Sequence, residues 1–174
     1  GSTEGYTLPN EVIDTKIEEL IALEGIQILM QGGLNPKLKI NYYEDLFRHL
    51  KLKYPQIWLH VLSAPEIDYI AKISELTLEE TLGRLKAAGL DSVPGAGGEI
   101  LVDRVRAEIS RGKCDSEDWL NVHRTCHKLG ITTTATMMYG HVETIEERIE
   151  HMLKIRKLQD ESLSKYGMGF TAFI

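Results

Sequence analysis

The sequence is poor in cysteine and contains no long apolar run. Its 174 residues include two cysteines, Cys114 and Cys126. Two cysteines at this separation form neither a disulfide framework nor a metal-ligand pair, so we expect Cys126 to be a small buried residue of a helix and Cys114 to stand near a helix start. No stretch reaches the roughly 18 apolar residues of a membrane span, and no signal segment opens the chain. We therefore expect a cytoplasmic protein with no membrane partner.

An excess of basic charge is also lacking. The formal net charge is -6 at pH 7, which gives no general attraction to phosphate backbones and argues against nucleic acid as a partner. Hydrophobic residues make up 43% of the chain and charged residues 26%, the mixture of a soluble globular core. With membranes and nucleic acid excluded, we expect the partner to be a small molecule.

The familiar catalytic and metal-binding motifs are missing as well. The chain has no Ser-His-Asp elbow, no paired-carboxylate motif and no metal cluster pattern. His123 and His127 are four residues apart and can share a helical face. No acidic third ligand stands nearby, so we expect this pair on an ordinary helix surface rather than in a zinc site, and we predict no metal ligand in this chain.

Helical and strand patterns alternate along the chain. Apolar residues at helical spacing, acidic first turns and terminal glycines predict helices, and short apolar runs that end in glycine or polar residues predict strands. Thr77 with Glu80 forms a capping-box pattern, and Gly89 is predicted to be a helix C-cap. Helices are predicted at 8–24, 41–54, 65–74, 77–89, 99–110, 115–130 and 144–161, and strands at 26–33, 56–63, 90–93, 132–139 and 170–174, with a loop at 162–169.

This alternation predicts an α/β fold in which about five parallel strands are joined by helical crossovers. Strands that are apolar on both faces fit a helix-covered sheet or the wall of a barrel. Five strands are too few for an eight-stranded barrel, and the chain opens on a turn-like stretch at 1–6 and stops inside a strand. We expect the open sheet edges to associate with another copy of the chain or with flanking segments.

The candidate site residues stand where the predicted strands end, because ligands of parallel α/β folds bind at the carboxyl ends of the strands. Gln31-Gly32-Gly33 either lets a ligand approach the backbone or forms only a tight turn. His60 alternates with two apolar neighbours and is either an active-site residue or a buried structural histidine. Ser63 ends the same strand.

Two more strand ends are candidates. Asp91 precedes a glycine-rich turn at 94–98 that lacks the Lys-Ser/Thr of a nucleotide-binding loop. Glu99 is predicted to begin the following helix, either as a cap favoured by the helix dipole or as a carboxylate that faces a cationic ligand. Gly140 and His141 lie in the run "TTTATMMYGHVET", which is predicted to be a buried strand that stops at a ligand site at Gly140.

Read together, four segments resemble one family. They are "ILMQGGLNPKL", "NYYEDLFRHLK", "GLDSVPGAGGEILVDRVR" and "TTATMMYGHVETIEERIEHMLKIRKLQDE" with the final "GFTAFI". They are similar to the radical S-adenosylmethionine (SAM) enzymes of the futalosine route to menaquinone and of deazaflavin synthesis, and the similarity covers essentially the whole chain. Within that family, "MQGG" and the Pro-Gly-rich turn favour the members that cyclise dehypoxanthine futalosine. The resemblance implies a partial TIM-type barrel with SAM and a 4Fe-4S cluster as cofactors.

The resemblance also assigns roles. Gln31, Gly32 and Gly33 match the motif whose backbone receives the methionine amino group, although Leu34 replaces its usual glutamate. Glu99 matches a position that contacts SAM.

Thr136, Met138, Gly140 and Glu143 fall on the adenine-binding pattern, and His141 is left open between an adenine contact and a turn residue. Ser63 is placed among the cofactor or substrate contacts. The base that completes the reaction is expected among His60, Asp91 and Glu99.

One departure from the family concerns the cluster. The family carries its 4Fe-4S cluster on a Cys-x-x-x-Cys-x-x-Cys loop, and this chain has no such motif. We therefore expect 1–174 to be the central part of the barrel domain, with the cluster loop, first strand and last strands outside it, and to be inactive by itself. Three alternatives remain open: aminofutalosine synthase, a deazaflavin synthase subunit, and a non-catalytic half-barrel that serves as an association module.

Overall fold

The computed structural model describes residues 5–174, so most of the turn-like stretch expected at 1–6 lies outside the described residues. Five strands form one parallel sheet in chain order, as the alternating pattern predicts. The strands are β1 (Gln27–Met30), β2 (Trp58–Val61), β3 (Ser92–Val93), β4 (Thr132–Ala135) and β5 (Phe170–Phe173). The sequential order makes the sheet a segment of a barrel wall, with β1 and β5 at its two edges.

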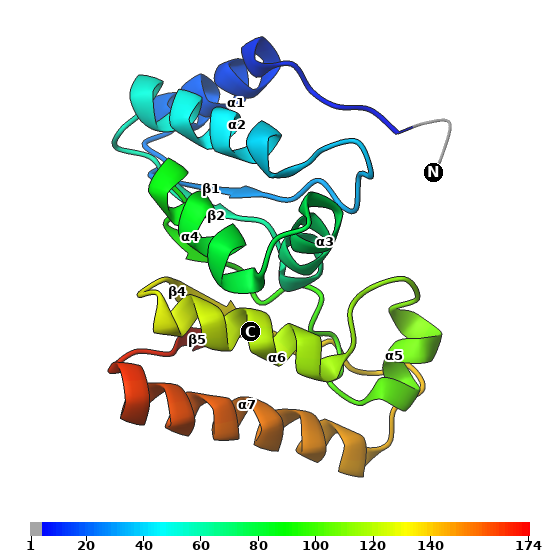
Figure 1. Ribbon diagram of the computed structural model, residues 1–174. Coiled ribbons are helices and arrows are strands. Elements are labelled where there is room, and N and C mark those ends of the chain that lie inside the picture. The colour runs from blue at the N-terminus through cyan, green and yellow to red at the C-terminus, as the bar shows by residue number, and fades with distance from the viewer. Residues whose placement is uncertain (1–4) are drawn as a thin grey trace.

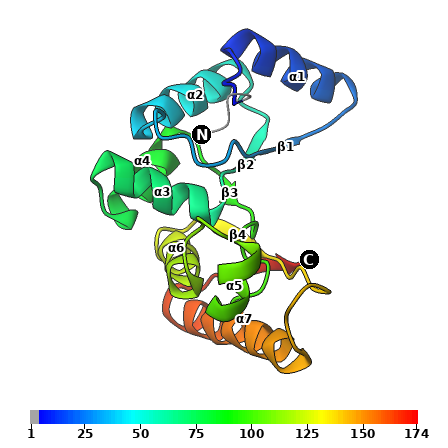
Figure 2. The ribbon, with the colours of Figure 1, turned by 90° about the vertical axis from the view of Figure 1, so that its right-hand side faces the viewer.

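Seven helices are present in the described residues, and most of them lie on one side of the sheet (Figures 1 and 2). They are α1 (Asn10–Ala22), α2 (Ile40–Lys53), α3 (Ala64–Ser74), α4 (Leu78–Ala88), α5 (Asp103–Ile109), α6 (Ser116–Lys128) and α7 (Ile145–Tyr166). In Figure 2, α2, α3, α4, α6 and α7 flank the sheet on the left and bottom of the view, with the strands beside them. None of the helices in residues 5–174 is long and apolar enough to cross a membrane.

The two faces of the sheet differ in burial. On β2, Leu59 and Val61 point into the core between sheet and helices and are almost fully buried. Trp58, which points the other way, is 45% exposed, and Leu29 on β1 is 63% exposed. Alternation therefore places His60 opposite Leu59 and Val61, as expected, on the face that the helices leave open. We call this uncovered side the inner face.

Several element boundaries differ from the predictions, and three of the differences have a clear physical reason. Helix α5 begins at Asp103, not at residue 99, because Glu99 has a left-handed backbone (φ 25°) and Val102 is extended. Strand β4 ends at Ala135, because the amides of Met137 and Met138 donate instead to the carbonyls of Ile174 and Glu99.

Helix α7 continues through the predicted loop at 162–169 as far as Tyr166 and stops at the left-handed Gly167. The buried Ser162 hydroxyl lies 2.7 Å from His127 Nδ1 on α6, which holds this turn of α7 against its neighbour.

The expectation for the two histidines of α6 was wrong. His123 and His127 are not on the helix surface but are 0% and 1% exposed. His123 packs against Trp119 and Phe170, with ring centroids 4.0 Å and 5.3 Å away. His127 Nε2 lies 2.8 Å from the Thr133 hydroxyl. The rings fill the layer between α6 and the sheet, so they are part of the core. Cys126 is buried on the same helix, and Cys114 precedes its N-cap, as predicted.

Candidate functional site

The loop after β1 is held by a carboxylate from another element. The amides of Gly32 and Gly33 donate to Oε1 of Glu66, at 2.7 Å and 2.8 Å. Glu66 is only 3% exposed. Because both amides are satisfied inside the protein, the glycine carbonyls and the open space beside them are the part of this loop that a ligand can reach.

Glu66 is held in place by the start of α3. Its Oε2 accepts hydrogen bonds from the amide and the hydroxyl of Ser63, at 2.7 Å and 2.6 Å. This is a capping box, in which the third helical residue reaches back to the N-cap residue. The Ser63 side chain, predicted to contact cofactor or substrate, is thus buried against Glu66 and acts as a helix cap. Leu62, just before it, has a left-handed backbone (φ 61°), a strained conformation that often occurs at functional sites.

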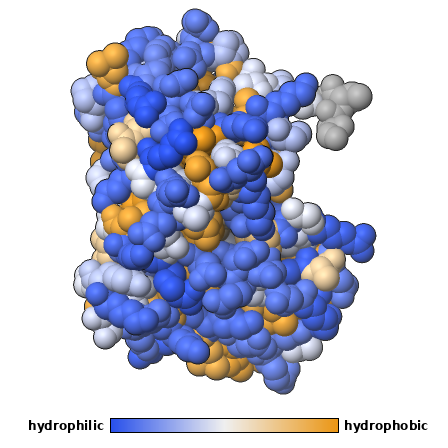
Figure 3. Space-filling model, viewed as in Figure 1, coloured by the Kyte–Doolittle hydropathy of each residue, from blue (hydrophilic) through white to orange (hydrophobic). Residues whose placement is uncertain are grey.

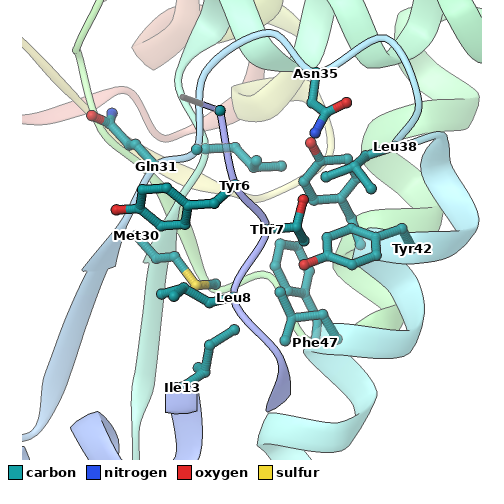
Figure 4. Close-up of a pocket in the computed structure, with 15 residues that line it drawn as sticks. Tyr6, Thr7, Leu8, Ile13, Met30, Gln31, Asn35, Leu38, Tyr42 and Phe47 are labelled. Atoms are coloured by element: carbon teal, nitrogen blue, oxygen red, sulfur yellow. The ribbon is translucent and has the colours of Figure 1, made fainter. Parts of the chain in front are cut away.

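A cavity of about 430 Å³ opens beside this loop. Figure 4 shows that the segment with Tyr6, Thr7 and Leu8 runs between the end of β1 and helix α2. Apolar side chains dominate its walls, with Gln31, Asn35 and tyrosine hydroxyls at its polar positions; the lining includes Met30, Gly32, Leu38, Tyr42, Tyr43 and Phe47. Burial raises the pKa of Tyr43 to about 12, so this phenol stays protonated.

The surface of the molecule is also hollowed. The space-filling view in Figure 3 shows this hollow on its right-hand side, between the segment that follows residue 4 and the α5 region.

The glycine-rich turn after β3 is packed against the sheet and against the buried Arg106. The Gly95 amide donates to Thr134 Oγ1, and the Gly95 carbonyl accepts from the Thr136 hydroxyl. A Cβ on Gly95 would lie 2.6 Å from Ala135 Cα, so close packing requires glycine here. The buried guanidinium of Arg106 donates to the carbonyls of Gly97 and Gly98. Two amides of this turn, those of Gly95 and Gly98, are thus bonded within the fold, and Arg106 occupies two of its carbonyls.

Glu99 lies at the end of this turn, and its carboxylate is occupied. It accepts from Lys113 Nζ at 2.6 Å and from the Ser110 hydroxyl at 3.0 Å, and Arg106 Nη1 lies 3.7 Å away. The Glu99 carbonyl accepts from the Met138 amide at 3.0 Å. The structure thus joins the turn after β3 to the loop after β4 through Glu99, while its side chain faces cations of the α5 region.

The loop after β4 is closed by Glu143. This carboxylate accepts from the amides of Gly140 and His141, at 2.6 Å and 2.9 Å, and from Arg148 at 2.8 Å. The hydrogen bond from the Gly140 amide is the largest cause that lowers the pKa of Glu143 to about 2. Thr144 is the N-cap of α7, and Glu143, just before it, clamps the loop. Gly140 has φ 97°, and a Cβ there would meet no atom within 4 Å.

The remaining two candidates, His60 and Asp91, are not in the loops that follow the strands. His60 is on the inner face of β2, with Nδ1 2.7 Å from the Ser92 hydroxyl. Asp91 precedes β3 at its amino end, where it accepts from the Leu59 amide at 2.6 Å and pairs with Lys51 at 2.5 Å. Because this is the opposite end of the sheet from Gly32 and Gly140, the structure does not bring Asp91 together with the other candidates.

The described residues do not fit an iron–sulfur cluster. Residues 5–174 contain no group of three His, Cys, Asp or Glu side chains that could hold a metal ion. Burial raises the pKa of the Cys114 thiol to about 12 and also raises that of Cys126, which opposes the thiolate form that metals require. No step is assigned to a cluster held by this part of the chain.

Comparisons with known proteins agree with the motif resemblance. The chain is 47% identical over 174 residues, all of it, to the cyclic dehypoxanthine futalosine synthase of Halalkalibacterium halodurans, of which it covers 46%. It is 47% identical to the aminodeoxyfutalosine synthase of Thermus thermophilus over 148 residues. These residues are 85% of this chain and 38% of that protein. It is 44% identical to the 5-amino-6-(D-ribitylamino)uracil–L-tyrosine 4-hydroxyphenyl transferase of Methanococcoides burtonii over 171 residues. These residues are 98% of this chain and 47% of that protein.

The chain therefore spans about half the length of the curated relatives it matches. The model of the Radical SAM superfamily matches residues 1–155. The parallel half-barrel, the strand-end loops and these matches agree, and the predicted family and fold class are confirmed. The chain belongs to the radical SAM superfamily.

Proposed function

We propose that this chain is the SAM-binding and substrate-facing part of an enzyme that cyclises dehypoxanthine futalosine. The observation that carries the choice is coverage: the similarity to the cyclase extends over every residue of the chain at 47% identity. The match to the aminodeoxyfutalosine synthase has the same identity but spans 148 residues. The half-barrel supplies what such an enzyme needs from its own residues, an open inner face beside a loop that can receive a polar ligand.

The residues at the end of β1 fit the amino group of SAM. A Cβ on Gly32 or Gly33 would meet no atom within 4 Å, so there is room for a ligand against this backbone. Glu66 takes the amide protons and leaves the carbonyl oxygens, which are acceptors suited to an ammonium group. The buried negative charge of Glu66 behind the loop adds to the attraction for a cation.

The residues after β4 fit the adenine ring. Met138 is 48% exposed and Tyr139 63% exposed, and the open space at Gly140 lets a flat ring approach the backbone. Glu143 and Glu99 hold the two sides of this loop, so its shape is set before a ligand arrives. In this superfamily SAM, when bound, supplies the reactive species that removes a hydrogen atom from the substrate.

Of the three residues considered for the base, His60 alone has its free side on the inner face. Glu99 is bound to Lys113, and Asp91 to Lys51 at the far end of the sheet. We assign substrate contact to His60 and structural roles to Glu99 and Asp91. Burial lowers the pKa of His60, so its ring is neutral at pH 7.

The test is made on a protein that carries this sequence at the length of its relatives, with iron and sulfide reconstituted. Incubation with SAM and dehypoxanthine futalosine should give the cyclic product, identified by mass spectrometry. Aminodeoxyfutalosine synthase is the second candidate because its identity to this chain is equal. Turnover of that enzyme's substrate, without turnover of dehypoxanthine futalosine, would replace the proposal with this alternative.

The 174-residue chain itself gives a separate test. Isothermal titration calorimetry should show SAM binding without a cluster, weaker than in the longer protein. If the chain binds no SAM and only self-associates with increasing concentration through the edges of β1 and β5, the half-barrel is an association module instead.

A further inference from the structure

Three polar side chains form a chain of hydrogen bonds on the inner face. Trp58 Nε1 donates to the Ser92 hydroxyl at 2.7 Å, and the same hydroxyl lies 2.7 Å from His60 Nδ1. The backbone fixes this grouping, because His60 and Ser92 are register partners on β2 and β3 and Trp58 lies two residues before His60. All three side chains therefore project from the same side of the sheet.

The positions of the hydrogens follow from what each group can donate. The indole N–H of Trp58 is a donor only, so Ser92 Oγ accepts from it. Ser92 is 5% exposed, so its own hydroxyl hydrogen needs an acceptor inside the protein. In the described part of the chain His60 Nδ1 is the acceptor within reach. The neutral ring of His60 then carries its proton on Nε2, and that N–H is the end of the chain.

The surroundings of this N–H on the sheet are uncharged. Leu29, Ser92 and Thr132 lie in register with His60 across β1, β3 and β4, and none of them is ionisable. Leu29 is 63% exposed and Trp58 is 45% exposed. An open aromatic and aliphatic surface with one fixed neutral donor is suited to a flat ring that carries an oxygen atom.

We propose that Trp58, Ser92 and His60 form a subsite for an aromatic ring that bears an oxygen acceptor. The ring lies against Trp58 and Leu29, and the oxygen accepts from His60 Nε2–H. This inference rests on the proposed function in one respect, that the inner face is where substrate binds. It makes His60 a hydrogen-bond donor in the resting protein rather than a free base, with Ser92 as the positioning residue that selects its tautomer.

The first measurement is the tautomer of His60 in the unliganded chain, by long-range ¹H–¹⁵N NMR of the imidazole at pH 7. The expected result is a protonated Nε2 and an unprotonated Nδ1. A protonated Nδ1 would overturn the proposal, and this measurement needs no variant. In Ser92→Ala, where the hydroxyl donor is gone, the His60 signals should shift toward a mixture of the two tautomers, and Ser92→Thr should restore the single one.

The second measurement uses two probes that differ only in the ring, benzoate and cyclohexanecarboxylate, titrated without SAM. Benzoate should shift the indole N–H signal of Trp58 and leave that of Trp119, which is 0% exposed, unmoved. It should bind about fivefold more tightly than cyclohexanecarboxylate, the size of one aromatic contact. Trp58→Leu should remove this preference, and Ser92→Ala should weaken benzoate about fivefold through loss of one oriented hydrogen bond.

Equal binding of both probes, or a preference for benzoate that persists in Trp58→Leu, would overturn the subsite. SAM titrated into the same sample separates this result from the proposed function. A chain that binds SAM but shows no preference for benzoate loses only the subsite. One that binds benzoate as expected but no SAM keeps the subsite and loses the proposed function.

Discussion

Oε1 of Glu66 lies 2.8 Å from the amide nitrogen of Gly33, although 33 positions separate the two residues in the chain. The contact joins the start of α3 to the loop after β1. It satisfies the amides of both Gly32 and Gly33 from inside the protein. Two consecutive glycines, which have no side chains to hold them, are thereby fixed by a buried carboxylate.

Replacement of Glu66 should weaken SAM binding more than it weakens the fold. In Glu66→Gln one oxygen becomes an NH₂ group, which cannot accept from the glycine amides or from Ser63. We expect the Kd for SAM to rise about tenfold, equivalent to about 1.4 kcal/mol, measured by calorimetry.

The matched control is Glu80→Gln. Glu80 forms the same capping box with Thr77 on α4 but is exposed and contacts no glycine loop. It should lose helix capping and keep SAM affinity. An equal loss of affinity in both variants would show that capping alone, and not the contact to Gly32 and Gly33, is responsible.

Two glycines at strand ends should respond to alanine in opposite ways. Gly95→Ala places a Cβ 2.6 Å from Ala135 Cα, and we expect a destabilisation of about 3 kcal/mol in urea unfolding. Gly32→Ala meets no atom within 4 Å, so the fold should keep its stability while SAM affinity falls, because the methyl group occupies the space beside the loop. If Gly32→Ala leaves the Kd for SAM unchanged, the ligand does not lie against this backbone.

The sequence predicts the elements well because their signals are local. The Thr77 and Glu80 pattern, the Gly89 stop and the alternation around His60 each depend on residues a few positions apart, and all three are found. Glu66 was missed although Ser63 and Glu66 have the same spacing as Thr77 and Glu80. The capping box was therefore readable, but no local signal shows that the other carboxylate oxygen reaches Gly32 across 34 positions.

The wrong expectation that His123 and His127 lie on the helix surface has a cause that is visible in the sequence. Trp119, Val122 and Cys126 form an apolar stripe on α6, and the two histidines fall on that stripe. The pattern placed them on the buried face, whereas their polarity suggested the surface. Position on the helix prevailed because a neutral imidazole can pack as an aromatic ring.

Buried histidines should make the fold lose stability below neutral pH. Burial lowers the pKa of His151 and of His127 to about 4, whereas unfolded histidine titrates near 6.5. Both states are neutral above pH 6.5. Between pH 6.5 and about 4 the unfolded chain binds protons that the folded chain does not, so each histidine lowers the free energy of unfolding by up to about 1.4 kcal/mol per pH unit.

The variant His151→Asn isolates one of these contributions. The Leu101 amide donates to His151 Nδ1 at 2.9 Å, and the asparagine oxygen can accept in its place without titrating. Urea unfolding between pH 4.5 and 7 should give a shallower pH dependence than in the unaltered chain. The exposed His141→Gln should retain the full slope. A His151→Asn slope as steep as that of the unaltered chain would show that this imidazole does not stay neutral in the fold.

Removal of the Glu143 charge should loosen the loop after β4. In Glu143→Gln the amides of Gly140 and His141 lose their shared carboxylate, and Arg148 loses its ionic partner. Hydrogen exchange at both amides should accelerate, and SAM affinity should fall because the backbone that we propose faces adenine is no longer fixed. Glu146→Gln is the control, since Glu146 is in the first turn of α7 and accepts from neither amide.

The Glu143 carboxylate also sets a pH window, because its folded pKa is lowered to about 2 from an ordinary 4.5. Its stabilisation is therefore complete above pH 4.5 and is lost as the pH falls toward 2, so exchange at Gly140 and His141 should depend on Glu143 at pH 6 and not below pH 2.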